Sequence, residues 1–425
     1  GVVIVDETGQ LGAKQMQALL NYVKECGGRI ICSGDTRQHG AVEASDALRA
    51  IEKYSGLIPA ELTAIRRQDP ARADSGAERE FIEEYKRAVQ EASSGLAAES
   101  FERLERQGAV VECGLEEQQD RLASHYLELA QKGESTVVVA QTWSEIRKVN
   151  ESVRAALKRA GLVQAEDHAV TTLEAVNLTD AQKRDARSYE PDSVLMFNRD
   201  TSGFRKGQRG RMLAISENAI IVEGGNKIRE VRFPQLGRIT VCRERETVIS
   251  VGDRLQLKAN ARTKEGRALA NGELVTVAGI ERDGRIVLGD GRTLERDYRQ
   301  FVRGYAVTSY GSQGKTVDYV LFSDSAVKAA TSRQQWYVTI SRGRKGVRIF
   351  TSDKEQLHEN ILRSGDRELA LDFTTQRQAK RQRVRQGPVA GLTRWRQIAD
   401  AICRRLAILA SRMRGQAPRA EISIS

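Results

Sequence analysis

Short runs of apolar residues alternate with amphipathic stretches along the first part of the chain. Val2–Val5 and Arg29–Ser33 have the composition of buried strands, and Lys14–Lys24 between them repeats apolar residues at helical spacing. Val137–Ala140 is a further run of this kind, and a helical pattern follows it over 146–157. Apolar strands separated by amphipathic helices are typical of a parallel sheet covered by helices. The pattern therefore predicts an α/β fold.

The pattern changes between about residues 165 and 300, where short alternating segments are separated by glycine-containing turns. Gly224-Gly225, Asn271-Gly272 and Asp283-Gly284 are examples. Such dipeptides favour the tight turns of β-hairpins, so a β-rich insertion is predicted here. After this insertion the α/β pattern returns, with strand candidates at 305–309, 319–322 and 347–351.

Positive charge is concentrated near the C-terminus. The net charge of the chain is +11. Twelve Lys or Arg residues and one acid, Asp400, lie between Arg377 and Arg419, so this segment carries 12 − 1 = +11 and the rest is balanced. Apolar residues repeat at helical spacing over 392–413, and Thr393 is suited to cap the start. Four roles suit a basic amphipathic helix of this kind: binding DNA, docking on a protein partner, lying on an anionic membrane surface, or packing on the body of the protein.

Several classes of protein are disfavoured by the composition. The five cysteines are scattered without a Cys-x-x-Cys pair, and the four histidines are isolated, so neither a zinc site nor a disulfide framework is predicted. No run of about 18 apolar residues is present, so no membrane span is predicted. The N-terminus has no basic region followed by a cleavage site. We expect a cytoplasmic protein, and the start inside a strand without methionine leads us to expect a longer parent.

Two neighbouring strand ends carry residues suited to nucleotide chemistry. Asp6 and Glu7 follow the first strand directly, and in a nucleotide hydrolase such acids lie near magnesium and the attacking water. Gln38 follows the next strand, where an amide can contact a γ-phosphate. Arg67 offers a guanidinium shortly before Pro70. Each feature also has a plain explanation, as a turn or as a solvated surface side chain.

The C-terminal half contains a matching set of polar residues. The segment 304–317 is predicted to form strand, loop and helix, with Thr308, Gln313 and Gly314 at the loop. Arg342 lies on a short segment before the last predicted strand. An arginine delivered from a second domain can stabilise charge on a phosphoryl group in transfer.

Six ordered segments together resemble motifs II to VI of superfamily 1B, RecD-like, DNA helicases. They read VVIVDE, GDTRQ, IRRQ, VVVAQT, GYAVTSYGSQGKTVD and YVTISRGR. The resemblance covers about residues 1–355. The segments Leu178–Gln182 and Tyr189–Ser193 make it most similar to the helicase region of TraI/TrwC-type conjugative relaxases. Val251–Asn260 with Asn271-Gly272 resembles the SH3-like barrel that RecD-like enzymes insert in their second RecA-like domain.

The resemblance implies a role for each candidate residue. Asp6 would hold Mg²⁺ through water, and Glu7 would activate the hydrolytic water. Gln38 and Arg67 would contact the γ-phosphate of ATP, and Arg342 would be the arginine finger. The strand-facing or coupling surface would be lined by Thr142, Thr308, Gln313 and Gly314. The implied cofactors are ATP and Mg²⁺, and the implied partners are single-stranded DNA and, through the basic tail, conjugation or secretion machinery.

Tandem RecA-like P-loop NTPase domains, the first of them partial, follow from the same resemblance. We expect 1–132 to be the C-terminal part of the first domain with connecting helices, and 133–164 to start the second. The β-rich insertion with the SH3-like barrel would occupy 165–300. The second domain would resume over 301–370, and the basic tail would be 371–425.

The chain departs from the family pattern in two places. The phosphate-cradling sequence GxxxxGK[ST] is absent from the 425 residues, so we expect it upstream in the parent and expect this stretch to be inactive alone. Tyr310 and Gly311 stand where the family often has His and Lys. Two alternatives stay open. One is a non-catalytic DNA-binding or coupling module. The other is an ATPase in which 309–316 forms a degenerate P-loop, with Lys315 and Thr316 gripping the nucleotide.

Overall fold

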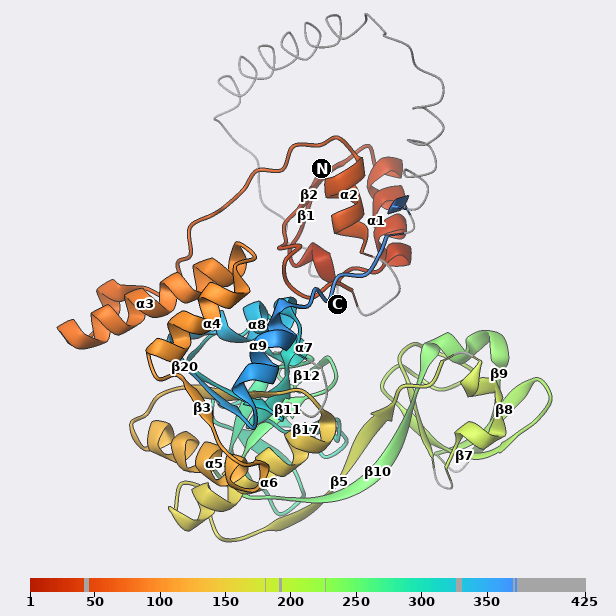
Figure 1. The fold of residues 1–425 in the computed structure, drawn as a ribbon. Coiled ribbons are helices and arrows are strands. Elements are labelled where there is room, and N and C mark those ends of the chain that lie inside the picture. The colour runs from red at the N-terminus through yellow and green to blue at the C-terminus, as the bar shows by residue number, and fades with distance from the viewer. Residues whose placement is uncertain are drawn as a thin grey trace, which may run out of the picture.

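The described part of the chain forms two α/β units and a β-rich insertion (Figure 1). A computed structural model describes residues 1–41, 46–179, 181–190, 193–225, 227–325, 331–369 and 371–372. The basic helix predicted over 392–413 lies outside these residues. Among the helices that are described, none is both long and apolar enough to cross a membrane.

The first unit is a small parallel sheet with two helices. Strand β1 (Val2–Val5) pairs in parallel with β2 (Arg29–Cys32), and α1 (Ala13–Glu25) makes the crossover between them. Helix α2 (Ala47–Tyr54) follows, capped by the side chain of Asp46. A parallel pair needs such a crossover because a hairpin cannot join strands of the same direction.

The second unit contains a five-stranded parallel sheet in the order β18-β4-β19-β20-β3. The interior strand β4, with the sequence TVVVA, is buried along its whole length. Successive residues point to opposite faces, so Val137 and Val139 join one apolar core while Val138 and Ala140 join another. The strands are β3 (Val110–Glu112), β4 (Thr136–Ala140), β18 (Ala306–Thr308), β19 (Val317–Asp324) and β20 (Gly343–Thr351).

Helices cover both faces of this sheet. The core that contains Val138 packs against α5 (Leu115–Gln131) and α6 (Trp143–Arg159). The core that contains Val137 has the fully buried Trp336 on it, whose indole N–H donates to Ser100 Oγ at 3.0 Å. The helices on that face are α3 (Gly76–Ser93), α4 (Ala97–Arg106), α8 (Arg333–Ile340) and α9 (Lys354–Leu362).

The second unit begins earlier in the sequence than the boundary at 132/133 that the sequence suggested. Strand β3 pairs with β20, with Val110 opposite Ile349, and α5 packs on the same sheet. The local pattern could not reveal this pairing, because a three-residue strand finds its partner more than two hundred residues away. Both elements therefore belong structurally with the second unit.

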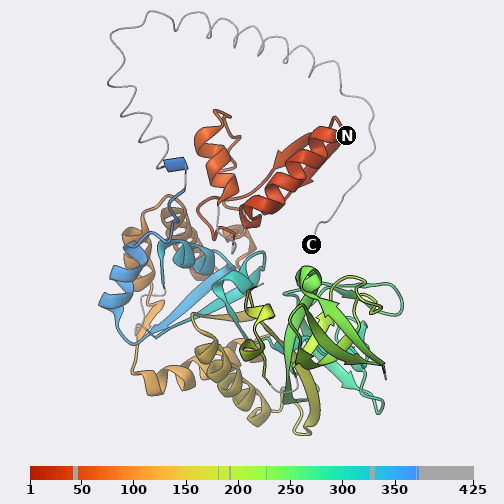
Figure 2. The ribbon, with the colours of Figure 1, turned by 90° about the vertical axis from the view of Figure 1, so that its right-hand side faces the viewer.

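The insertion contains two larger antiparallel sheets and one two-stranded sheet, and it is β-rich as the glycine-containing turns led us to expect. A long ribbon of β5 (His168–Val176) and β10 (Ile239–Ile249) carries a small sheet at its far end (Figure 1, Figure 2). That sheet is formed by β6 (Val194–Phe197), β7 (Arg209–Ile215), β8 (Ala219–Gly224) and β9 (Lys227–Arg232).

The other sheet of the insertion has its own apolar core around Leu255, Val277 and Leu288. Gly284 turns the β14–β15 hairpin with a φ of 85°, a conformation that glycine adopts without strain. The five-stranded order is β16-β15-β14-β11-β17. Its similarity to an SH3-like barrel stays a prediction. The strands are β11 (Arg254–Leu257), β14 (Leu274–Ile280), β15 (Ile286–Leu288), β16 (Thr293–Leu294) and β17 (Phe301–Arg303), and beside them are β12 (Ala261–Arg262) and β13 (Ala268–Leu269).

Short helices complete the described fold. The four-residue α7 (Ser309–Ser312) follows β18 directly. The 3-10 turns are Thr8–Gln10, Pro70–Arg72, Gln182–Arg184, Ala186–Ser188 and Phe233–Arg238.

A buried ion pair joins the insertion to the second unit. Arg154 on α6 donates from Nε to both carboxylate oxygens of Asp253, at 2.8 and 3.0 Å. Asp253 is fully buried and also accepts from the Tyr305 hydroxyl at 2.8 Å. Arg154 reaches Asp167 and the Ser250 hydroxyl with Nη2. Because these partners come from α6, from both strands at the root of the ribbon and from the edge of the sheet, the pair fixes where the insertion leaves the unit.

We expect Asp253→Ala to lower the free energy of unfolding by about 3 kcal/mol, because it leaves the Arg154 guanidinium buried without its main carboxylate. Urea titration followed by circular dichroism measures this. As a control, Asp283→Ala removes an exposed carboxylate that pairs with Arg285 and should leave the urea midpoint unchanged. Equal, small effects of both variants would contradict the structural role of the buried pair.

Candidate nucleotide site between the two α/β units

The paired acids lie at the end of β1 in a strained turn. Glu7 has a left-handed backbone (φ 50°, ψ 38°), and its N–H donates to Asp6 Oδ1 at 2.9 Å. The buried Thr8 hydroxyl donates to Val5 O, and its N–H donates to Ser33 O at the end of β2. A left-handed residue other than glycine costs about 1–2 kcal/mol, so these bonds hold the Glu7 carboxylate where it is.

The loop after β2 carries an acid that the sequence did not single out. Asp35 accepts from the Arg37 N–H, from Gln38 Nε2 at 3.3 Å and from the hydroxyl of Tyr337 at 2.9 Å. Tyr337 belongs to α8, so this bond crosses from the first unit to the second. Gly34 allows the loop to pass close to the turn after β1, because a Cβ there would lie 3.3 Å from the backbone nitrogens of Thr8 and Gly9.

The same loop meets the segment after β18. Gln313 Nε2 donates to Gln38 Oε1 at 3.2 Å. The buried His39 ring stacks on Tyr310 with a centroid distance of 3.9 Å, and His39 Nε2 and Ser309 Oγ share a hydrogen bond of 2.7 Å. Burial, aided by the charge of Arg342, lowers the pKa of His39 to about 4. His39 is therefore neutral at physiological pH, and it is an interface residue and not an isolated surface histidine.

Arg67 and Arg342 are the cationic residues of this boundary. Arg67 donates from Nε to Thr316 Oγ1 at 3.0 Å and from Nη1 to the carbonyl of Ser341. Arg342 is almost fully buried and donates to Val338 O and to Ser341 Oγ. Gln68, the residue after Arg67, bonds the carbonyl of Gly343, so the segment that carries Arg342 is held from both sides.

Positive charge at this boundary is not compensated by an ion pair. Burial and then the charge of Arg67 lower the pKa of Arg342 to about 10, while Glu7 acts in the opposite direction. Burial likewise lowers the pKa of Arg67, and Glu7 again opposes the shift. Within the described ranges neither guanidinium is within 4 Å of a carboxylate. Two such guanidiniums near Glu7 can take a phosphate oxyanion, which accepts bidentate bonds from arginine.

The boundary also has carboxylates for a magnesium site. Asp6 and Glu7 lie next to each other at the strand end, and Mg²⁺ in nucleotide hydrolases uses one or two carboxylates together with phosphate oxygens. The acids present therefore fit Mg²⁺ bound with a nucleotide. In the described residues no group of three or more His, Cys, Asp or Glu could hold a metal by itself.

The four residues expected at a strand-facing surface are spread over two loops. Thr142 and Thr308 cap α6 and α7, with hydroxyls that accept from the N–H groups of Glu145 and Gly311. Gln313 faces Gln38, and Gly314 adopts a φ of 75°. The predicted order of strand, loop and helix is wrong. The short helix α7 comes first and the loop with Gln313 and Gly314 comes after it, because Thr308 already provides the cap.

A degenerate P-loop over 309–316 does not fit this geometry. A P-loop needs a helix N-terminus directly after its Gly-Lys-Thr, so that backbone N–H groups face the phosphates. Here Lys315 and Thr316 lead straight into β19. Lys315 donates to the carbonyl of Gly272, and Thr316 accepts from Arg67. This segment therefore connects the insertion to the boundary between the units.

Sequence reasoning missed several residues that build the boundary. Asp35, His39, Gln68 and Tyr337 all make bonds across it. Three of them lie within or next to the segments GDTRQ and IRRQ, and this proximity was the available signal. Tyr337 carried no comparable signal, because its partner lies 302 positions away in the sequence.

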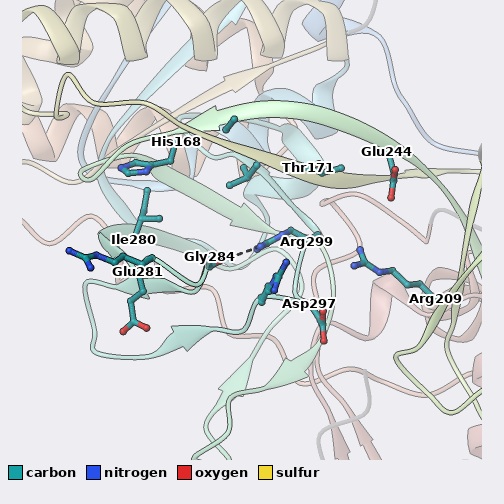
Figure 3. Close-up of a pocket in the computed structure, with 13 residues that line it drawn as sticks. His168, Thr171, Arg209, Glu244, Ile280, Glu281, Gly284, Asp297 and Arg299 are labelled. Atoms are coloured by element: carbon teal, nitrogen blue, oxygen red, sulfur yellow. Dashed lines mark hydrogen bonds between the residues drawn. The ribbon is translucent and has the colours of Figure 1, made fainter. Parts of the chain in front are cut away.

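A separate pocket of about 470 Å³ lies where the ribbon meets the second sheet of the insertion (Figure 3). Arg299 donates to the carbonyl of Gly284, and the charges of Arg209 and Arg296 reach it. Acidic residues also line this pocket. None of the residues predicted for the nucleotide site or for the strand-facing surface lines it. The charged lining residues are Arg209, Glu244, Glu281, Arg282, Arg296, Asp297 and Arg299.

Comparison with known proteins gives matches over most of the chain. Residues 1–114 match the family described as AAA domain. The multifunctional conjugation protein TraI of Escherichia coli is 22% identical over 396 residues, which are 83% of this chain and 22% of that protein. The probable conjugal transfer protein TraA of Sinorhizobium fredii (strain NBRC 101917 / NGR234) is 23% identical over 236 residues, which are 53% of this chain and 18% of that protein. The chain thus spans about a fifth of the length of these relatives.

Solved structures with a related arrangement are Pif1 helicases. The Bacteroides enzyme in complex with ADP-AlF3 and single-stranded DNA has 15% sequence identity and a TM-score of 0.36, and the match covers 89% of this chain and 76% of that one. The Candida albicans enzyme has 13% identity and a TM-score of 0.37, over the same 89% of this chain and 76% of its own.

The sequence matches agree with the six ordered segments and with the α/β fold. The two parallel sheets fit tandem RecA-like domains, so this part of the predicted fold class is confirmed, while the SH3-like barrel stays a prediction. The chain therefore resembles the superfamily 1B helicases and, among them, the conjugation protein TraI.

Proposed function

We propose that this chain forms part of an ATP-dependent motor that moves along single-stranded DNA, as the helicase region of a conjugative relaxase. The observation that supports this most is the cluster at the unit boundary. Glu7 from the first unit acts electrostatically on both the half-buried Arg67 and the buried Arg342, and neither has an ion pair in the described ranges. An acid beside two uncompensated guanidiniums suits phosphoryl transfer to water.

Each residue has a distinct task in this proposal. Glu7 orients the attacking water and accepts its proton as a general base. Gln38 and Arg67 hold the oxygens of the terminal phosphate, and Arg342 stabilises the negative charge that grows there during transfer. Mg²⁺, held through water by Asp6, would neutralise charge on the β- and γ-phosphates.

Coupling to DNA follows from the bonds that cross the boundary. Gln38 contacts both Asp35 and Gln313, so loss of a terminal phosphate at Gln38 changes a bond to the loop of the second unit. Arg67 holds Thr316 in the same loop. Because Thr142, Thr308 and Gly314 lie on that unit, we propose that they face the DNA strand or transmit its position.

The proposal also covers the partner of the basic tail and the cellular location of the protein. The charge of +11 between Arg377 and Arg419 favours a polyanionic partner, and we infer DNA or the conjugation machinery. We also infer a cytoplasmic location, since the cysteines are scattered and the four in the described residues are free.

A second candidate is a non-catalytic DNA-binding or coupling module. The 425 residues contain no GxxxxGK[ST] sequence, and this favours it for the chain taken alone. ATP turnover of this chain, compared with a parent protein that includes such a sequence, separates the two. Turnover only by the longer protein supports the motor, and turnover by neither supports the module.

In the longer protein we expect Arg342→Ala to lower kcat for ATP about 10³-fold or more, because it removes the charge that stabilises the transferring phosphoryl group. Glu7→Gln should lower kcat at least 10²-fold, because an amide cannot accept the proton from water. Steady-state phosphate release with and without single-stranded DNA gives both values.

Arg344→Ala is a matched control for Arg342→Ala. Arg344 lies on the same segment but pairs with Asp318 at the surface, so its loss should leave kcat within about twofold. DNA binding should survive in all three variants. Turnover at the wild-type rate in Arg342→Ala would refute the role given to that residue.

The buried His39 predicts that acid weakens the contact between the units. Its pKa is lowered from 6.5 to about 4 in the folded protein, so the unfolded state binds more protons between these values and stability falls as the pH falls from about 6.5 to 4. We expect a loss on the order of 2 kcal/mol between pH 8 and pH 5. His39→Gln keeps a hydrogen-bonding group for Ser309 but does not titrate, so this variant should lack the loss of stability that comes from His39.

Urea unfolding of the wild type and of His39→Gln at both pH values makes the measurement. All other titrating groups are common to the two proteins, so the difference between them isolates His39. An identical pH dependence would show that His39 is not buried at this contact.

A further inference from the structure

An exposed tryptophan and a lysine meet where α6 begins beside the second sheet of the insertion. Trp143 is the first residue of α6, and half of its surface (50%) is exposed. The ammonium of Lys258, just after β11, lies 5.0 Å from the centroid of the indole ring. A cation over an aromatic ring fixes the orientation of both groups and leaves the remaining exposed ring surface available for a ligand.

Two further cations lie near this pair. Lys315 donates to the carbonyl of Gly272, and Arg254 donates to the carbonyl of Thr136 at 2.6 Å. Burial lowers the pKa of Lys258 and of Lys315, and the charges of Arg254 and Lys258 lower that of Lys315 further. Lys315 thus lies partly buried within electrostatic reach of both Lys258 and Arg254.

No nearby carboxylate neutralises these cations. In the described ranges none of Lys258, Lys315 and Arg254 has an ion pair. The two acids that reach them electrostatically are already engaged, since Glu273 is held by Arg292 and Glu174 lies 3.6 Å from Arg245. A phosphate would supply the missing negative charge.

We propose that Trp143, Lys258 and Lys315 form a binding platform for a single nucleic-acid strand, with one base stacked on Trp143 and the adjoining phosphate held by the two ammonium groups. The proposal rests on the motor function given above and adds where the strand is gripped. Aromatic rings stack on any base, whereas a duplex keeps its base faces covered, so the ring favours a single strand without sequence preference.

The arginine-lined pocket in Figure 3 is another place where cationic side chains gather. Its four arginines share the pocket with three carboxylates, and no Trp, Tyr or Phe ring lines it. That mixed lining does not select an anion as clearly as the platform does. The platform also lies next to the boundary between the units, since Lys315 precedes the Thr316 that Arg67 holds.

Binding of a labelled oligothymidylate to the longer protein, followed by fluorescence anisotropy, tests the platform. We expect Trp143→Ala to weaken binding about 10-fold or more through loss of base stacking, and Trp143→Phe to recover most of it. Lys258→Ala should lower the slope of log K against log salt by about 0.7, the value for one phosphate contact on a single strand. Binding of a blunt duplex should change little in any variant.

Matched controls come from α6 and from the residues that follow it. Leu162→Ala removes an exposed apolar side chain just beyond the other end of α6, and Lys148→Ala removes an exposed charge from α6 itself. Both should bind the oligonucleotide like the wild type. The exposed position of Trp143 means that its variants should unfold in urea at the wild-type midpoint, which confirms that binding and not folding has changed.

The outcomes separate the platform from the motor proposal. If the wild type binds the strand and Trp143→Ala binds equally well, the platform is refuted and the motor stands. If Trp143→Phe is as weak as Trp143→Ala, stacking on the ring is refuted as the source of affinity. If the wild type does not bind single strands, both proposals fall.

Discussion

The rest of the structure depends on one electrostatic constraint, the placement of the buried Arg342 guanidinium beside the half-buried Arg67 guanidinium without a neutralising carboxylate in the described residues. Arg342 is nearly inaccessible, and Arg67 shares its surroundings. Burying an unpaired charge is costly, so the backbone around both groups supplies carbonyl oxygens from Val338 and Ser341 in place of a carboxylate. A nucleotide that enters with its own negative charge would relieve this cost, and the units would close on it for that reason.

The constraint explains why loops from both units converge. Gly343 follows Arg342 directly, and a Cβ on it would lie 2.6 Å from the Tyr85 hydroxyl, so only glycine allows this close packing beside the arginine. The strained backbone of Glu7 is a second local cost at the same boundary. Local features that are individually unfavourable therefore gather where the chemistry is proposed, while the two apolar cores of the second unit provide the stability that sustains them.

The sequence predicted the fold class and most elements, because apolar periodicity reports which side of a strand or helix is buried. It also placed Glu7, Gln38, Arg67 and Arg342 in ordered segments that do meet in space. It did not predict the partners that join the units, such as Tyr337 for Asp35 or Tyr310 for His39. Those bonds connect residues hundreds of positions apart, and their formation depends on how whole units dock. The short strand β3 was missed for the same reason, since its pairing with β20 is set by tertiary packing.

The ribbon of β5 and β10 has a mechanical consequence. Nine consecutive residue pairs, from His168 with Ile249 to Val176 with Val241, join its two strands. At about 3.4 Å per residue the paired length is roughly 30 Å, and its root is held firmly by Arg154 and Asp253. Because the ribbon is long and attached at one end, a tilt of about 10° at the root would move the small sheet at its tip by roughly 5 Å. Slight adjustments near α6 can therefore become large displacements of a distant surface.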